Sequence, residues 1–312
     1  MHFLRLLRPI NLAIIALTMY GTGWFLEYYT DCIGELWTID FFLLVLSTVI
    51  IAGAGNIIND YFDIKADRIN KPERMIIGKH VKRRVAILSH WFLNLVAFSI
   101  AVYLSWKFNT FWYVFAHFMA INFLWFYSTN LKRGFLLGNI VVAGLTALVP
   151  ILVGFYFYHL VSIKEISSGA HYQTIHELIG SLVWIIAGLA LFAFILNLAR
   201  EITKDIEDIE GDKLLKAKTL PIVMGKSIAK YIVALVIGIG AILLSGVLIN
   251  YADILVTHLI LGLVSLIFMV SAAIALFAMS SDKGVKLTNN LLKLSMTAGL
   301  LVPVYIRLME VL

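Results

Sequence analysis

Two charged segments of the sequence carry the same pattern of three aspartates. The first set, in NDYFDIKAD, is Asp60, Asp63 and Asp67, and the second, in KDIEDIEGD, is Asp205, Asp208 and Asp212. The spacing in each set is three and then four residues, so a helix would place the three carboxylates within about 60° of one another at about 100° per residue. Asn56 lies one turn before the first set and Glu201 one turn before the second. The sequence therefore predicts two acidic helix faces, related by a faint internal repeat.

Carboxylates in this pattern indicate a divalent cation. Acidic groups within about 4–6 Å of one another repel, and a metal ion removes that cost. The ligands would all be oxygen atoms and Cys32 is the only cysteine, which favours Mg²⁺ or a similar hard ion over zinc. Mg²⁺ usually takes about one or two carboxylates and completes its coordination with water and phosphate oxygens. The pattern therefore predicts a phosphorylated ligand, most simply a diphosphate held between two Mg²⁺ ions.

Basic residues accompany both acidic segments. They are Arg68, Lys71 and Arg74 after the first, Arg200 and Lys204 within the second, and Lys132 and Arg133 in a third segment, YSTNLKRG. Such groups stabilise the charge on a departing diphosphate. Lys82, Arg83 and Arg84 precede a long apolar run and are better explained as anchors for lipid head groups. Acid–base clusters at helix ends are most often solvated surface, so it is the matched pair of acidic sets that favours a functional site.

The composition predicts that membrane helices carry these segments. Of the 312 residues, 61% are hydrophobic and 14% are charged, with a mean hydropathy of +0.91, whereas soluble domains are roughly 45–50% apolar and about 25% charged. A spanning helix needs about 20 apolar residues. Such runs occur at about 9–28, 39–58, 86–106, 110–128, 137–158, 177–198, 229–250, 253–278 and 288–310. We therefore expect an all-α, polytopic membrane bundle of nine transmembrane helices, forming one domain over 1–312 with a central cavity open to the cytoplasmic side.

The placement of basic residues predicts the orientation of the bundle. With a cytoplasmic N-terminus, 21 lysines and arginines fall on the cytoplasmic side and three on the opposite side. This bias follows the positive-inside rule, which also explains the formal net charge of +6 without invoking nucleic acid. Both acidic segments, in loops at about 59–85 and 199–228, are then cytoplasmic. The expected location is the cell (inner) membrane, with the C-terminus on the opposite side.

The acidic segments resemble the two motifs of the UbiA-type intramembrane prenyltransferases. NDYFDIKAD is similar to the family's NDxxDxxxD, KDIEDIEGD to KDxxDxxGD, YSTNLKRGFLLGN to YxxxLKRxxxxGN, and LRPINL to its usual start. One departure is Met75 in NKPERMI, where relatives often carry a proline, which bears on how the donor or acceptor fits near that loop. The resemblance covers essentially the whole chain. It implies Mg²⁺-dependent transfer of an isoprenyl group from an isoprenyl diphosphate to a lipophilic acceptor, among membrane lipids.

The resemblance also implies a role for each matching residue. Metal and diphosphate binding would fall to Asp60, Asp63 and Asp67 with Asn56 and Asn59, and a second ion to Asp208 and Asp212 with support from Asp205. Contacts with the diphosphate or an anionic acceptor would fall to Arg74, Lys132, Arg133, Arg200 and Lys204, and Tyr127 would line the pocket. The residues expected to be catalytic are Asp60, Asp63, Asp67, Asp208 and Asp212.

The motifs favour one acceptor without excluding others. KDIEDIEGD together with LKRGFLLGN resembles the branch of the family that transfers a geranylgeranyl group from geranylgeranyl diphosphate to geranylgeranylglyceryl phosphate. The alternative is an aromatic quinone precursor of the hydroxybenzoate, dihydroxynaphthoate or homogentisate type. Outside enzymes the alternative is a cation-coupled transporter, although transporters place their acids near mid-membrane in broken helices.

Overall fold

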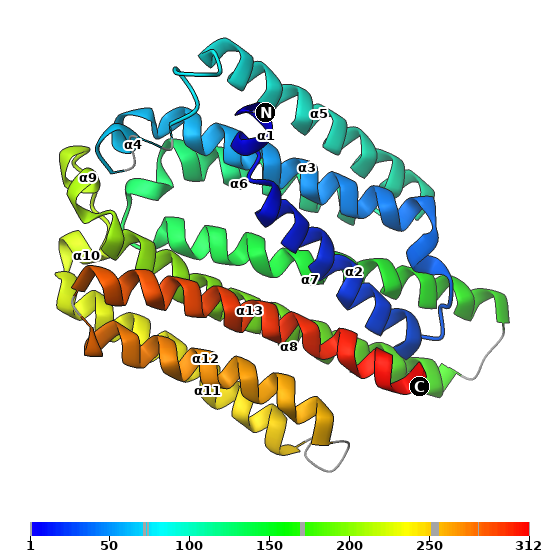
Figure 1. Ribbon diagram of the computed structural model, residues 1–312. Coiled ribbons are helices and arrows are strands. Elements are labelled where there is room, and N and C mark those ends of the chain that lie inside the picture. Colours follow the sequence, from blue (N-terminus) through cyan, green and yellow to red (C-terminus); the bar gives the residue numbers. More distant parts are fainter. Residues whose placement is uncertain are drawn as a thin grey trace. The chain divides into compact units, whose positions relative to one another are not determined.

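All regular elements in the described part of the chain are helices (Figure 1). The computed structural model describes residues 2–70, 73, 75–168, 172–250, 256–279 and 281–311. Within these residues the only strand-like contact is an isolated bridge between Ile77 and Val81. The prediction of an all-α chain is confirmed.

Each predicted apolar run coincides with a long helix. The long helices are α2 (Pro9–Tyr29), α3 (Ile39–Phe62), α5 (Arg83–Lys107), α6 (Trp112–Thr129), α7 (Leu137–Ser168), α8 (Tyr172–Glu207), α11 (Lys226–Asn250), α12 (Val256–Ala278) and α13 (Ser281–Val311). Short helices lie between them: α1 (His2–Leu6), α4 (Ile64–Asn70), α9 (Ile209–Leu214) and α10 (Leu220–Val223), with 3₁₀ turns η1 (Glu35–Trp37) and η3 (Leu131–Arg133). The short helices α4 and α9 follow α3 and α8 directly, at the two acidic segments.

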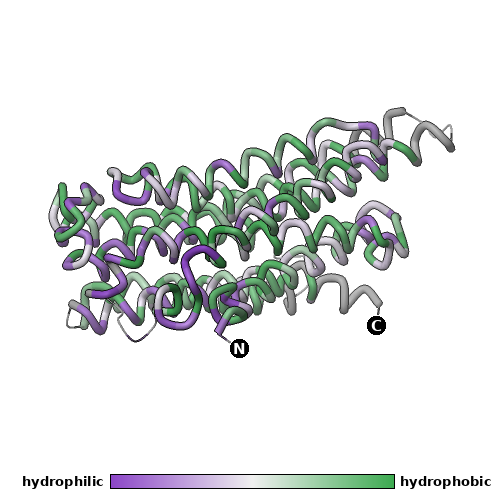
Figure 2. The backbone as a smooth tube through the Cα atoms, turned by 90° about the horizontal axis from the view of Figure 1, so that it is seen from above, coloured by the Kyte–Doolittle hydropathy of each residue, from purple (hydrophilic) through white to green (hydrophobic). Residues whose placement is uncertain are grey.

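Seven helices in the described residues are long and apolar enough to cross a membrane: α2, α3, α5, α7, α8, α11 and α12. Helices α6 and α13 coincide with predicted runs but are not among these seven. Helix α13 begins with the polar sequence SDKGVKLTNN, which lowers its hydropathy. Figure 2 shows hydrophobic residues along most of the helices and many hydrophilic residues at helix ends and connections. The chain is an integral membrane protein, and the count of nine spans stays a prediction.

The chain divides into two compact units. One consists of residues 1–131 and 149–187, and the other of residues 132–148 and 188–312. The first unit contains the acidic segment at the end of α3, and the second contains the acidic segment at the end of α8. We therefore describe the two segments separately.

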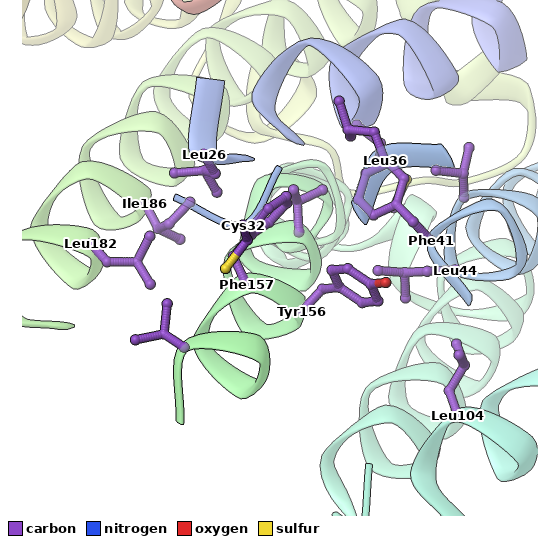
Figure 3. Packing of buried hydrophobic residues seen from close by; sticks show 14 of the residues in the cluster. Leu26, Cys32, Leu36, Phe41, Leu44, Leu104, Tyr156, Phe157, Leu182 and Ile186 are labelled. Atoms are coloured by element: carbon purple, nitrogen blue, oxygen red, sulfur yellow. The ribbon is translucent and has the colours of Figure 1, made fainter. Parts of the chain in front are cut away.

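The core of the first unit is aromatic where α3 and α7 approach η1. Phe41 of α3 and Tyr156 of α7 meet edge to face, with ring centroids 5.2 Å apart, and Figure 3 shows them beside Leu36 of η1. The Tyr156 hydroxyl shares a hydrogen bond of 2.9 Å with Thr38 and donates one of 3.2 Å to Glu35. These contacts fix the start of α3, the helix that carries the first acidic segment at its other end.

A smaller apolar cluster holds the chain that follows this acidic segment. Its buried members are Leu6, Ile57, Ile64, Ile77, Val81 and Ala86, from α1, α3, α4, the connection before α5, and α5 itself. Burying one such side chain stabilises a fold by about 1.5–3 kcal/mol. The cluster therefore keeps α4 and the connection close to the end of α3.

The second unit has its own core around the end of α8. Leu196, Ile202 and Ile206 of α8 are buried with Leu220 of α10 and Val233 of α11. The buried positions 202 and 206 are one turn apart, and the acidic residues of the segment lie between and beyond them. Packing of this apolar face fixes the rotation of α8, and with it the direction of its polar face.

Candidate functional site

The first acidic segment starts in α3 and continues past the end of that helix. Asn56, Asn59 and Asp60 lie in the last two turns of α3. Asp63 follows at the junction with α4, and its N–H donates to the carbonyl of Asn59 at 3.0 Å. Asp67 lies in α4, and its N–H donates to the carbonyl of Asp63 at 2.8 Å. The predicted acidic face is therefore interrupted at Asp63, while the helical hydrogen-bond spacing continues across the break.

The second acidic segment has the same local structure. Asp205 lies in the last turn of α8, which ends at Glu207. Asp208 is the N-cap of α9, and its N–H donates to the carbonyl of Lys204 at 2.9 Å. Asp212 lies in α9, and its N–H donates to the carbonyl of Asp208 at 3.1 Å. In both segments the first aspartate is in a long helix, the second is at a break and the third is in a short helix.

The N-terminal segment contacts the first acidic segment. A guanidinium nitrogen of Arg8 pairs with a carboxylate oxygen of Asp60 at 2.5 Å, and the side-chain amide of Asn56 donates to the carbonyl of Leu7 at 3.0 Å. Arg8 has a left-handed backbone, with φ of 57°, at the start of α2. The LRPINL stretch therefore brings a cation to the first aspartate. The side chain of Asp63 is buried, at 6% exposure.

Asparagine 139 supports the first aspartate of the second segment. The side-chain amide of Asn139, near the start of α7, donates to a carboxylate oxygen of Asp205 at 2.8 Å. Asn139 is itself buried. An amide donor orients a carboxylate without neutralising it, so Asp205 keeps lone pairs for a further ligand.

A buried glutamate organises the basic residues of the second segment. Glu201 is 6% exposed; its carboxylate forms an ion pair with Lys204 and a second one with Arg200, at 3.3 Å. Lys132 also interacts electrostatically with Glu201 and with Asp205. The predicted cations Arg200, Lys204 and Lys132 therefore gather around one anionic group inside the second unit.

The remaining predicted residues lie at the end of α6 and just after it. Tyr127 is in the last turns of α6, while Arg133 is in η3, where its carbonyl accepts a hydrogen bond of 2.8 Å from the N–H of Lys218. Arg74 and Lys71 fall outside the described residues.

The two segments offer a donor set that suits Mg²⁺. Their side chains supply carboxylate and amide oxygens, the hard ligands that Mg²⁺ prefers. Within the described residues, no three His, Cys, Asp or Glu side chains are close enough to form a metal site by themselves. A Mg²⁺ ion is usually held by about one or two carboxylates together with phosphate oxygens and water, so each segment would supply part of a coordination shell.

Residues 12–295 of the chain match the sequence pattern of the UbiA prenyltransferase family. This range includes both acidic segments and the segment from Tyr127 to Asn139. The chain belongs to the UbiA prenyltransferase family.

Two relatives of this UbiA family member carry the same name. The chain is 31% identical over 283 residues to the digeranylgeranylglyceryl phosphate synthase of Methanosphaera stadtmanae, covering 90% of each protein. It is 37% identical over 195 residues to the protein of the same name from Thermococcus kodakarensis, covering 62% of this chain and 60% of that relative.

Solved structures share the fold of this UbiA family member. A structure described as digeranylgeranylglyceryl phosphate synthase superposes with a TM-score of 0.64 at 24% identity, covering 97% of this chain and 96% of the other. A UbiA homologue from Archaeoglobus fulgidus, bound to GPP and Mg²⁺, gives a TM-score of 0.58 at 18% identity, covering 97% and 99%.

Three site contacts were not predicted from the sequence. The contacts of Arg8 and Asn139 depend on the fold, because Arg8 is 52 residues from Asp60 and Asn139 is 66 residues from Asp205. Glu201 pairs instead with its near neighbours in sequence, Arg200 and Lys204. A signal did exist for each of them. Arg8 lies in LRPINL, Asn139 ends LKRGFLLGN, and Glu201 lies one turn before the second acidic set.

Proposed function

We propose that this protein transfers a geranylgeranyl group from geranylgeranyl diphosphate to the free hydroxyl of geranylgeranylglyceryl phosphate. The observation that carries the proposal is the alignment over 90% of the chain with a relative named digeranylgeranylglyceryl phosphate synthase. The two acidic segments with their adjacent cations supply the groups that such a reaction requires.

In the proposed reaction one carbon–oxygen bond is exchanged for another. The bond between the allylic carbon and the diphosphate breaks, and its electron pair leaves with the diphosphate. The acceptor oxygen bonds to that carbon and its proton passes to the solvent, so the products are a diether phosphate, diphosphate and a proton. Mg²⁺, when bound, supplies Lewis-acid stabilisation of the leaving group.

We assign the holding of two Mg²⁺ ions to the two acidic segments. Asp60, Asp63 and Asp67 would hold one ion and Asp205, Asp208 and Asp212 the other, each together with diphosphate oxygens. Asn56 and Asn59 would donate amide hydrogen bonds to the diphosphate, and Tyr127 would line the prenyl pocket. Basic side chains would offset the negative charge that develops on the diphosphate. These are Arg74, Lys132, Arg133, Arg200 and Lys204.

The membrane helices would provide the rest of the chemistry. An apolar environment suits a long isoprenyl chain and keeps bulk water away from the cation-like carbon. We propose nine spans, a central cavity open to the cytoplasm, and a cytoplasmic N-terminus in the cell membrane, as the positive-inside rule favours.

The test is a product assay on the purified full chain in a neutral detergent. Geranylgeranyl diphosphate and Mg²⁺ would be combined separately with geranylgeranylglyceryl phosphate, hydroxybenzoate, dihydroxynaphthoate and homogentisate, and products identified by mass spectrometry. We expect a diether phosphate from the first acceptor, abolished by a chelator and restored by Mg²⁺. A prenylated ring without any diether product would overturn the acceptor assignment and keep the prenyltransferase one.

A further inference from the structure

A cavity lies beside the first acidic segment and is lined by residues to which the proposed function gives no role. It has a volume of about 490 Å³ and is lined by Ile64, Arg68, Met75, Ile77, Gly78, Lys79 and Arg83. These residues come from α4, the connection between α4 and α5, and the first residue of α5. The volume falls in the usual range for small-ligand pockets, about 300–1,000 Å³.

A tight hydrogen-bonded turn forms one wall of this cavity. The N–H of Gly78 donates to the carbonyl of Val81 at 2.8 Å, and the N–H groups of His80 and Val81 both donate to the carbonyl of Ile76, at 2.9 and 3.1 Å. Gly78 has φ of 89°, which a glycine adopts without strain. Ile77 and Val81 anchor the turn in the buried cluster with Ile57 and Leu6, so the wall is held in place.

The lining combines positive charge with an apolar surface. Three of its side chains, Arg68, Lys79 and Arg83, are cationic, and the described lining residues include no carboxylate. Such a site attracts an anion that arrives without a metal ion, since a Mg²⁺-bound diphosphate would need carboxylate ligands. A phosphate monoester carries a charge of about −1.5 to −2 at neutral pH and offers three acceptor oxygens, which suits three cationic donors.

The apolar part of the lining indicates that the anion belongs to a lipid. Ile64, Met75 and Ile77 contribute its apolar side chains. A flexible thioether side chain adapts to an irregular apolar ligand. In the sequence, Ile64 follows Asp63 and Arg68 follows Asp67, so the cavity adjoins the segment assigned to the donor diphosphate.

We propose that this cavity binds the phosphate monoester of the acceptor lipid through Arg68, Lys79 and Arg83. The proposal rests on the proposed function, because it names the subsite for the acceptor of that reaction. Binding the acceptor phosphate here would place its glycerol hydroxyl on the side of the first acidic segment. It also explains how a phosphorylated glycerol would be preferred over an uncharged one.

Steady-state kinetics of single substitutions test the subsite. Arg83→Gln and Arg68→Gln should each raise the KM for geranylgeranylglyceryl phosphate about 10-fold, as expected for losing one charge-assisted hydrogen bond. The KM for geranylgeranyl diphosphate should stay within about twofold. Arg84→Gln removes the same charge one residue beyond the lining and should leave both KM values unchanged. With geranylgeranylglycerol, which lacks the phosphate, wild type and variants should have the same high KM.

Two competition experiments distinguish binding of the acceptor phosphate from binding of a bulk membrane lipid. Inorganic phosphate should compete with the acceptor in wild type and compete more weakly in Arg83→Gln. Phosphatidic acid added to neutral micelles should act as a weak competitor of the same kind. If the variants lost only a response to phosphatidic acid and kept the acceptor KM, the cavity would be a site for bulk lipid and the proposal would be wrong.

The remaining outcomes separate this proposal from the proposed function. A rise in the KM of the diphosphate donor would assign the cavity to the donor and overturn the acceptor subsite. Unchanged kinetics in both variants, with wild type making the diether, would overturn the subsite alone. No diether from wild type, with turnover of an aromatic acceptor, would overturn both.

Discussion

The middle aspartate of each acidic segment occupies the residue where a long helix ends and a short one begins. Asp63 follows the last residue of α3, and Asp208 follows the last residue of α8. A residue at such a break keeps its backbone hydrogen bond to the preceding turn. The two flanking aspartates of each segment therefore lie in different helices, one long and one short.

Neutralising either middle aspartate should therefore stop the reaction without unfolding the chain. Asp63→Asn and Asp208→Asn keep the shape of the side chain but remove the charge that would balance a metal ion. We expect product formation to fall at least about 100-fold in each variant, with the helical circular dichroism unchanged. Asp282→Asn is the matched control, since that side chain is 88% exposed. Near-normal turnover in either variant would contradict the assignment of that segment.

Glu201 is expected to hold the cations of the second segment rather than to contact substrate. Glu201→Gln leaves Arg200 and Lys204 without a balancing charge, and breaking such a buried pair costs about 3 kcal/mol where one partner is partly exposed. We expect that loss in the free energy of unfolding, measured by denaturation in detergent. Glu210→Gln, at an exposed position of α9, should have no effect. A fully stable Glu201→Gln variant would show that the ion pairs contribute nothing.

A histidine pair at the N-terminus gives a pH-dependent contact. His2 of α1 stacks on His80, with ring centroids 3.9 Å apart. Repulsion from His80, followed by desolvation and repulsion from Arg5, lowers the pKa of His2 below its ordinary value. The folded chain thus favours the neutral His2 ring. The contact therefore stabilises α1 fully at pH values above the ordinary histidine pKa of about 6.5. This stabilisation is lost as the pH falls through the lowered pKa of His2 in the folded chain.

Removing the charge of the partner should raise the pKa of His2. NMR titration of histidine-labelled protein should show this upward shift in both His80→Gln and His80→Phe. The second variant keeps an aromatic ring for stacking, so agreement between the two would assign the effect to charge. A pKa of His2 that did not move in either variant would contradict this explanation.

At the scale of elements, close helix packing in the second unit depends on a glycine. A Cβ atom added to Gly284 of α13 would lie 2.5 Å from the carbonyl oxygen of Ala275 in α12. Beside it, the Thr288 hydroxyl donates to the carbonyl of Ala272 at 3.0 Å. Small residues let membrane helices approach closely enough for such contacts, which replace the hydrophobic driving force that lipid does not supply.

Gly284→Ala should therefore separate α12 from α13 and lower stability. A backbone carbonyl cannot rotate away as a side chain can, so we expect a loss of about 1–3 kcal/mol in the free energy of unfolding. Gly238→Ala in α11 is the control, because an added Cβ there meets no atom within 4 Å. Equal stability of the two variants, measured by thermal unfolding in detergent, would contradict the close approach.

At the scale of the whole molecule, spacing and hydropathy in the sequence were enough to predict an all-α membrane chain and two matched acidic segments. They did not predict the breaks at Asp63 and Asp208, because the spacing of three and then four residues suits an uninterrupted helix equally well. They also could not pair Arg8 with Asp60 or Asn139 with Asp205, since these contacts depend on how separate helices pack. Local pattern thus predicted the candidate groups, and tertiary packing determined their partners in the structure.

At the scale of the whole molecule, the distribution of charge also predicts the orientation of the chain in the membrane. Thiol labelling from the two sides of the membrane tests this prediction. Cys32 is the only cysteine and is 8% exposed, so Cys32→Ser gives a background without thiols. In that background Trp37→Cys, at an 85% exposed position of η1, should react with a membrane-impermeant maleimide on intact cells. Glu210→Cys, in α9, should react only after the cells are opened, because the positive-inside rule places the acidic segments in the cytoplasm. The reverse pattern would put both acidic segments outside, where the cytoplasmic supply of an isoprenyl diphosphate could not reach them.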